Sequence, residues 1–73
     1  APKAQYRLED LQGMHFEELS ELREIIRQQR DKAKRRAKLA KKQKFRQSNE
    51  QKVVEKQREV DILDRMREKL RYE

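Results

Sequence analysis

Residues 27–46 read RQQRDKAKRRAKLAKKQKFR and form the basic block around which this chain is organised. Eleven of these twenty residues are Lys or Arg, and Asp31 is the single acid, so the block has a net charge of +10. The other 53 residues carry ten basic and thirteen acidic side chains, a net charge of −3. Because the block has no Gly or Pro and consists mainly of strong helix formers, we expect a rigid basic helix. A helix with this charge indicates a polyanionic partner.

The composition of the 73-residue chain limits the size of its core. Hydrophobic residues make up 33% of the chain and charged residues 48%, so it is too small and too polar to bury a normal globular core. One Gly, one Pro and many Glu, Lys, Arg, Gln and Leu residues favour helix over disorder. We therefore expect an all-α chain with little independent core.

The predicted architecture has two long helices separated by a break. Residues 15–46 are expected to form the first helix, with His15 as a local capping or packing residue at its start. Residues 47–50 are expected to form the break, because Ser48-Asn49-Glu50-Gln51 matches the capping box that opens many helices. Residues 51–72 then form the second helix. An antiparallel hairpin, an extended pair and one continuous helix all remain open.

Residues 1–14 precede the first long helix as a tail and a short turn. We expect residues 1–5 to be a mobile tail. Residues 6–12 form either a short helical turn or a loop that places Leu8 and Leu11 against the next helix. Gly13 is expected to stop this element, because glycine tolerates the left-handed backbone found after many helices.

Apolar residues at three- and four-residue steps predict one packing stripe on each long helix. The side chains expected to pack are Phe16, Leu19, Leu22, Ile26, Val53, Val60, Leu63, Met66 and Leu70. Beyond Ile26 the stripe thins to Ala33, Ala37 and Ala40. Such small residues admit a second helix or a sugar-phosphate chain at close range, or simply favour the helix. No heptad pattern persists through the basic block, so a homo-oligomeric coiled coil is not supported.

The residue types needed for catalysis or metal binding are scarce. His15 is the single histidine and there is no cysteine, so we expect no catalytic residues, no metal site and no cofactor. No apolar run approaches the ~20 residues that span a bilayer. The face opposite the charge is mostly alanine, which is too weakly apolar for a membrane-surface helix. We therefore expect an intracellular protein that is not an enzyme and makes no membrane contact.

RNA binding is the function that the basic block favours. The residues expected to contact phosphates are Arg27, Arg30, Lys32, Lys34, Arg35, Arg36, Lys38, Lys41, Lys42, Lys44 and Arg46. Arginines can fork onto two phosphate oxygens, while lysines act as point charges. Because the chain has few aromatic residues and no base-reading scaffold, recognition should follow backbone and shape rather than sequence.

The alternative function is a coiled-coil-like scaffold segment. Such a segment would bridge protein subunits in a cytoskeletal or chromatin assembly, and its cations would meet acidic protein surfaces. The KAKRR and KKQK clusters could also act as a nuclear import signal, which is a pattern of low specificity.

The order of the two helical segments resembles a ribosomal family. LEDLQGMHFEELSELREIIRQQRDK (8–32), a further twenty residues and VVEKQREVDILDRMREKL (53–70) are similar to the small two-helix-hairpin protein of the large ribosomal subunit. Leu8 and Leu11 stand where that family often has a Leu/Ile pair, and MHFEEL (14–19) where it has Met-Thr-x-Glu-Glu-Leu. The sequence departs from the family in His15, in its lack of a Gly or Pro turn and in the less basic start of its second helix. The resemblance implies a structural protein that lies on ribosomal RNA near the polypeptide exit tunnel, with neighbouring ribosomal proteins as further partners.

Overall fold

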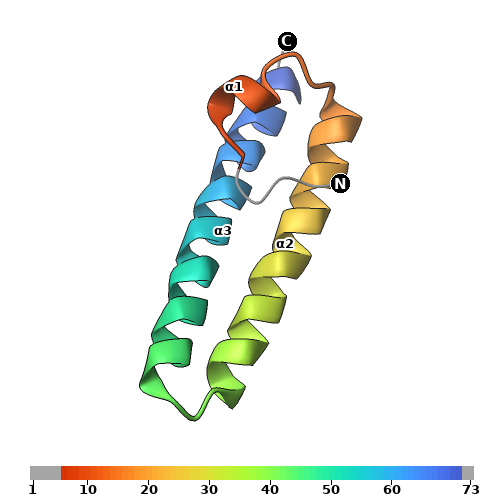
Figure 1. Ribbon diagram of the computed structural model, residues 1–73. Helices are drawn as coiled ribbons and strands as arrows, with labels where there is room; N and C mark the ends of the chain where they lie inside the picture. The colour runs from red at the N-terminus through yellow and green to blue at the C-terminus, as the bar shows by residue number, and fades with distance from the viewer. Residues whose placement is uncertain (1–5, 72–73) are drawn as a thin grey trace.

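The computed structural model describes residues 6–71, which form a helical hairpin with a short additional helix (Figure 1). In this part of the chain there are three helices and no strand: α1 (Leu8–Leu11), α2 (Phe16–Leu39) and α3 (Gln43–Arg71). α2 and α3 run antiparallel side by side, and α1 lies at the end far from their turn. The molecule measures 47 × 18 × 17 Å. The all-α prediction is confirmed in its hairpin form, and the alternatives of an extended pair and of one continuous helix are wrong.

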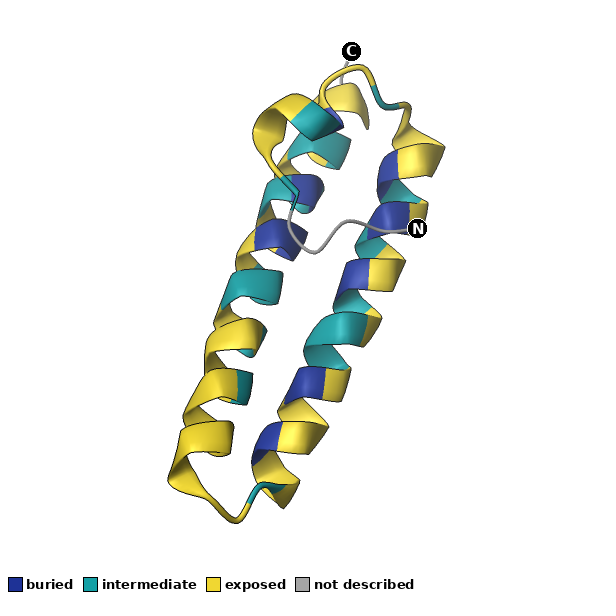
Figure 2. Ribbon diagram, in the orientation of Figure 1, coloured by how far each residue is buried: buried dark blue, intermediate teal, exposed yellow. Residues whose placement is uncertain are grey.

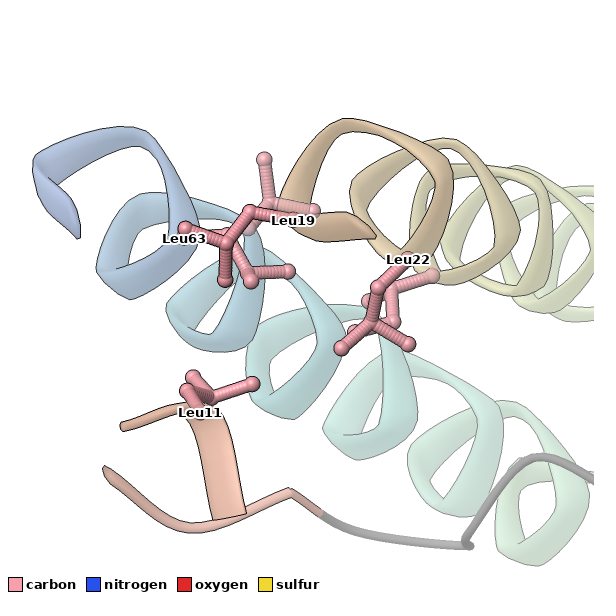
Figure 3. Packing of buried hydrophobic residues seen from close by; sticks show 6 residues of the cluster. Leu11, Leu19, Leu22 and Leu63 are labelled. Atoms are coloured by element: carbon pink, nitrogen blue, oxygen red, sulfur yellow. The ribbon is translucent and has the colours of Figure 1, made fainter. Parts of the chain in front are cut away.

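The buried apolar residues gather at the open end of the hairpin, which is the end where α2 begins and α3 finishes. One cluster joins all three helices, and its members are Leu11, Leu19, Leu22, Ile26, Val60 and Leu63 (Figure 3). Tyr6, Met14, Ile62 and Met66 pack against it and are partly buried. Burying a side chain of this size stabilises a fold by about 1.5–3 kcal/mol. We call the part of the hairpin that contains this cluster the open half. Most of the stabilisation of the hairpin therefore comes from the open half.

Two of the nine predicted packing residues lie at the surface instead. Phe16 is 37% exposed and Leu70 is 36% exposed. Phe16 is the first residue of α2, and the guanidinium of Arg67 lies over its ring, 5.0 Å from the centroid. Leu70 lies in the last turn of α3, beyond the buried cluster. Each residue stands near a helix end, where the opposite helix covers less of its surface, so both are less buried than the central packing residues. Val53 is partly buried.

Polar contacts across one side of the hairpin define the register of α2 against α3. The Ser20 hydroxyl accepts a hydrogen bond from Arg67, Arg23 pairs with Asp64, and Arg30 donates to Gln57. From one contact to the next, the α2 residue advances by three and then by seven positions. The α3 residue goes back by the same three and seven positions. This constant pairing means that the two helices keep one register from the open end past their middle.

The turn between the long helices lies at residues 40–42, so the prediction of a break at 47–50 was wrong. Equal steps inward from Arg30 and Gln57 reach residues 43–44, the first residues of α3, so the helix pairing favours a turn near 40–42 over one at 47–50. Ala40 adopts an extended backbone (φ −72°, ψ 123°), and the guanidinium of Arg46 donates to its carbonyl at 3.1 Å. The Ser-x-x-Gln pattern at 48–51 lies inside α3, where the side chain of Asn49 bonds back to the Phe45 carbonyl. The match to a capping box was therefore coincidental.

The segment before α2 folds back over the hairpin. The backbone N–H of Tyr6 donates to Glu59 Oε1 at 2.8 Å, and Glu59 is only 6% exposed. α1 follows, so the helical alternative for residues 6–12 is confirmed, and Leu11 packs into the core. Gly13 comes after α1 with φ +85°, as predicted for a helix stop. The predicted mobile tail at 1–5 and the last two residues of the chain lie outside the described residues.

We expect Leu63→Ala to destabilise the hairpin by about 2–5 kcal/mol, because it removes buried methyl groups and leaves a cavity between the three helices. Urea unfolding followed by circular dichroism measures the change. Leu39→Ala is the matched control, since Leu39 is 80% exposed, and we expect it to change stability by less than about 0.5 kcal/mol. Equal effects of the two substitutions would show that the cluster is not the main source of stability.

A second expectation concerns the left-handed residue after α1. We expect Gly13→Ala to lower the stability by about 1 kcal/mol, because a Cβ is strained at positive φ although no atom lies within 4 Å to clash with it. Gly13→Asn should be less damaging, because asparagine tolerates this conformation better. Thermal unfolding of both variants tests the order, and a more stable alanine variant would contradict the assigned backbone strain.

Candidate nucleic-acid interface

The exposed cations near the turn form the candidate interface. Nine of the eleven predicted phosphate contacts lie in this region, and all nine are exposed: Lys32, Lys34, Arg35, Arg36, Lys38, Lys41, Lys42, Lys44 and Arg46. We call residues 32–49 the turn end. This stretch contains no Asp or Glu. Figure 2 shows that the buried surface thins out on α3 toward the turn. The hairpin therefore gathers nine cations around one tip.

All ion pairs recorded within residues 6–71 lie outside the turn end. Arg23 and Arg67 pair with Asp64, and Lys56 Nζ lies 3.3 Å from Glu59 Oε2. Arg46 is the one turn-end cation in the described chain with a recorded hydrogen bond, and its acceptor is the Ala40 carbonyl, which does not cancel its charge. The carboxylates of the protein thus neutralise cations of the open half and leave those of the turn end unpaired.

Arg27 and Arg30, the other two predicted contacts, are held by carboxylates of α2. Arg27 Nη2 lies 2.6 Å from Glu24 Oε1, and Arg27 Nη1 lies 3.4 Å from Asp31 Oδ2. The hydrogen bond between Arg27 and Glu24 lowers the pKa of Glu24 below its ordinary value and raises the pKa of Arg27. Arg30 Nη2 lies 3.0 Å from Asp31 Oδ1, and its Nη1 donates to Gln57. Because both charges are met within the chain, we leave these two residues out of the interface proposed below.

A groove of about 530 Å³ lies between α2 and α3 next to the turn end. Ala33 is one of its lining residues and is buried. The lining residues are Gln29, Lys32, Ala33, Arg36, Asn49, Lys52, Glu55 and Lys56. Four of them are cations and one is an acid, so the lining has a net charge of +3. The groove is therefore lined by both long helices and carries an excess of positive charge.

Lys52 and Lys56 join the groove although they lie outside the predicted contact set. In the sequence they follow the basic block and stand between glutamates, so local charge gives no reason to select them. The antiparallel pairing brings them opposite Lys32 and Arg36 of α2. The sequence can place these two lysines in the groove only if the position of the turn is known, because the turn determines which residues of α2 and α3 face each other.

Among residues 6–71 no group of three or more His, Cys, Asp or Glu side chains is placed to hold a metal ion. In the same residues no helix combines the length and apolar character needed to cross a bilayer. His15 is the N-cap residue of α2, and its backbone N–H donates to Glu18 Oε1 at 3.3 Å. His15 thus stands at the helix start, as predicted, and the Glu18 side chain supplies the bond to its backbone.

Comparisons with protein families, with curated proteins and with solved structures find no match to this chain. The resemblance to the ribosomal two-helix protein therefore stays a prediction.

The unpaired cations of the turn end should make the stability of the hairpin depend on salt. Raising NaCl from about 10 mM to about 150 mM shortens the Debye length from roughly 30 Å to roughly 8 Å. Because repulsion among the nine cations is then screened, we expect the melting temperature to rise, as measured by circular dichroism. A fall in melting temperature would mean that the ion pairs of the open half contribute more than the repulsion at the turn end.

Proposed function

We propose that this protein is a non-catalytic RNA-binding structural component of a ribonucleoprotein assembly such as the ribosome. It would insert the turn end of its hairpin among RNA phosphates and recognise them by charge and shape. The open half would act as the folded base that holds the two helices together.

One observation carries the proposal: nine exposed cations surround the turn, with no carboxylate in the stretch 32–49 and no ion pair to any of them within residues 6–71. A protein that neutralises phosphates with Lys and Arg releases condensed counterions, and this release is a large source of RNA affinity. If five to eight of the cations contact phosphates, log affinity should fall against log salt with a slope of about −4 to −6.

The distribution of the cations around the tip also favours RNA over a flat acidic surface. Lys34, Arg35 and Lys38 follow the buried residue Ala33 by one, two and five positions, so they point away from the helix pair. Lys32 and Arg36 instead line the groove between the helices. A partner that meets both sets must surround the tip, as the phosphates of a folded RNA can do.

A charge-neutralising pair tests the proposal. We expect Arg35→Gln with Lys38→Gln to weaken binding to an RNA stem–loop and to reduce the salt slope by about 2, because each lost phosphate contact removes about one unit of slope. Fluorescence anisotropy at several salt concentrations measures both quantities. Arg65→Gln with Lys69→Gln is the matched control, since it removes the same residue types from the exposed surface of α3 at the open end.

Two outcomes would contradict the proposal. One is an RNA affinity that barely depends on salt. The other is an equal loss of affinity in both double variants, which would mean that net charge alone, and not the turn end, sets the binding.

The scaffold function remains a second candidate because of one apolar groove at the open end. This groove has a volume of about 400 Å³, and Leu8, Leu11, Met14, Met66 and Leu70 supply its apolar lining. Leu8 is 57% exposed there, and Arg65 and Lys69 also line the groove. A neighbouring protein could cover it, and in that case assembly would survive neutralisation of the turn end.

A further inference from the structure

Two exposed apolar side chains stand within the positive turn end. Leu39 is the last residue of α2 and is 80% exposed, and Phe45 lies in the first turn of α3 and is 56% exposed. Both flank the turn at residues 40–42. Lys38, Lys44 and Arg46 are their immediate neighbours in the chain. An exposed aromatic ring between two cations is not explained by phosphate contacts alone.

Helical phase places both apolar residues on the side of the hairpin that carries the groove. Leu39 follows Lys32 by seven residues along α2, and Lys52 follows Phe45 by seven residues along α3. Seven residues make about two helical turns, so each pair shares one helix face. Lys32 and Lys52 both line the groove. One continuous surface therefore runs from the cationic groove to an aromatic residue at the tip.

This arrangement matches the chemistry of single-stranded nucleic acid. Proteins that bind single strands combine a positive groove that follows the backbone with an aromatic side chain on which a base stacks. The bases of a duplex are already stacked on one another and would not reach Phe45. A lipid surface would need a broad apolar face opposite the charge, whereas two side chains among nine cations provide only a small one.

We propose that this face of the hairpin binds an unpaired RNA segment, with phosphates in the groove and a base stacked on Phe45. Lys32, Arg36 and Lys52 would hold the phosphates, and Leu39 would extend the apolar platform beside the ring. The inference rests on the proposed RNA-binding function and narrows it to loops, bulges or single strands.

The test compares a single-stranded RNA that carries the fluorescent base 2-aminopurine with a blunt duplex of the same length. We expect wild-type protein to prefer the single strand and to change the fluorescence of the probe when the base stacks. Phe45→Leu should lower single-strand affinity about tenfold, since one stacked base contributes roughly that factor or more. The duplex affinity should stay unchanged, and Phe45→Tyr should bind like the wild type.

Phe16→Leu is the matched control, because Phe16 is a partly exposed phenylalanine at the start of α2, far from the turn. Lys52→Gln tests the groove separately and should reduce the salt slope for the single strand by about 0.7. Circular dichroism of each variant shows whether its helices are intact.

The inference is overturned if duplex and single strand bind equally well, or if Phe45→Leu binds the single strand like the wild type. The broader function survives either result, provided that Arg35→Gln with Lys38→Gln still weakens binding to the stem–loop. Tight binding of the wild type to phosphatidylserine vesicles that is lost in Phe45→Leu, without any RNA preference, would instead assign the tip to a membrane and remove both proposals.

Discussion

The contact of three helices in one small apolar cluster is the constraint on which the rest of this structure depends. Leu11 from α1, Leu19 and Leu22 from α2, and Leu63 from α3 converge at the open end (Figure 3). A chain with so few apolar residues cannot build a second cluster of this size, so the helix register is set here and by the adjacent polar contacts. The position of the turn then follows from the pairing of the two helices.

The location of the apolar cluster, at the end of the hairpin far from the turn, explains how the turn end tolerates so many like charges. The large buried apolar side chains and all ion pairs among residues 6–71 lie outside residues 32–49, where the buried residues are the small Ala33 and Ala37. Exposed cations separated by water repel one another only weakly at physiological salt. The stable half of the hairpin can therefore carry a half that is densely positive.

The candidate site belongs to neither helix alone. α2 supplies five of the nine turn-end cations, while α3 adds Lys44, Arg46, Lys52 and the aromatic ring of Phe45. Because the helices are antiparallel, residues that lie twenty or more positions apart in the sequence face the same groove. Folding into a hairpin thus arranges the cations of the basic block, which are consecutive in the sequence, around the turn and along one groove.

The sequence by itself determined the helical class, the stop at Gly13 and the membership of most of the core, because these depend on local propensity and on three- and four-residue periodicity. It also located the cations, since charge is a property of composition. The turn position needed the tertiary structure, because Ala, Lys and Gln at 40–43 favour helix as strongly as their neighbours and only the pairing of α2 with α3 interrupts them. The surface positions of Phe16 and Leu70, the burial of Glu59 beneath Tyr6 and the entry of Lys52 into the groove were likewise decided by contacts between segments distant in the sequence. Local patterns carry no information about such contacts.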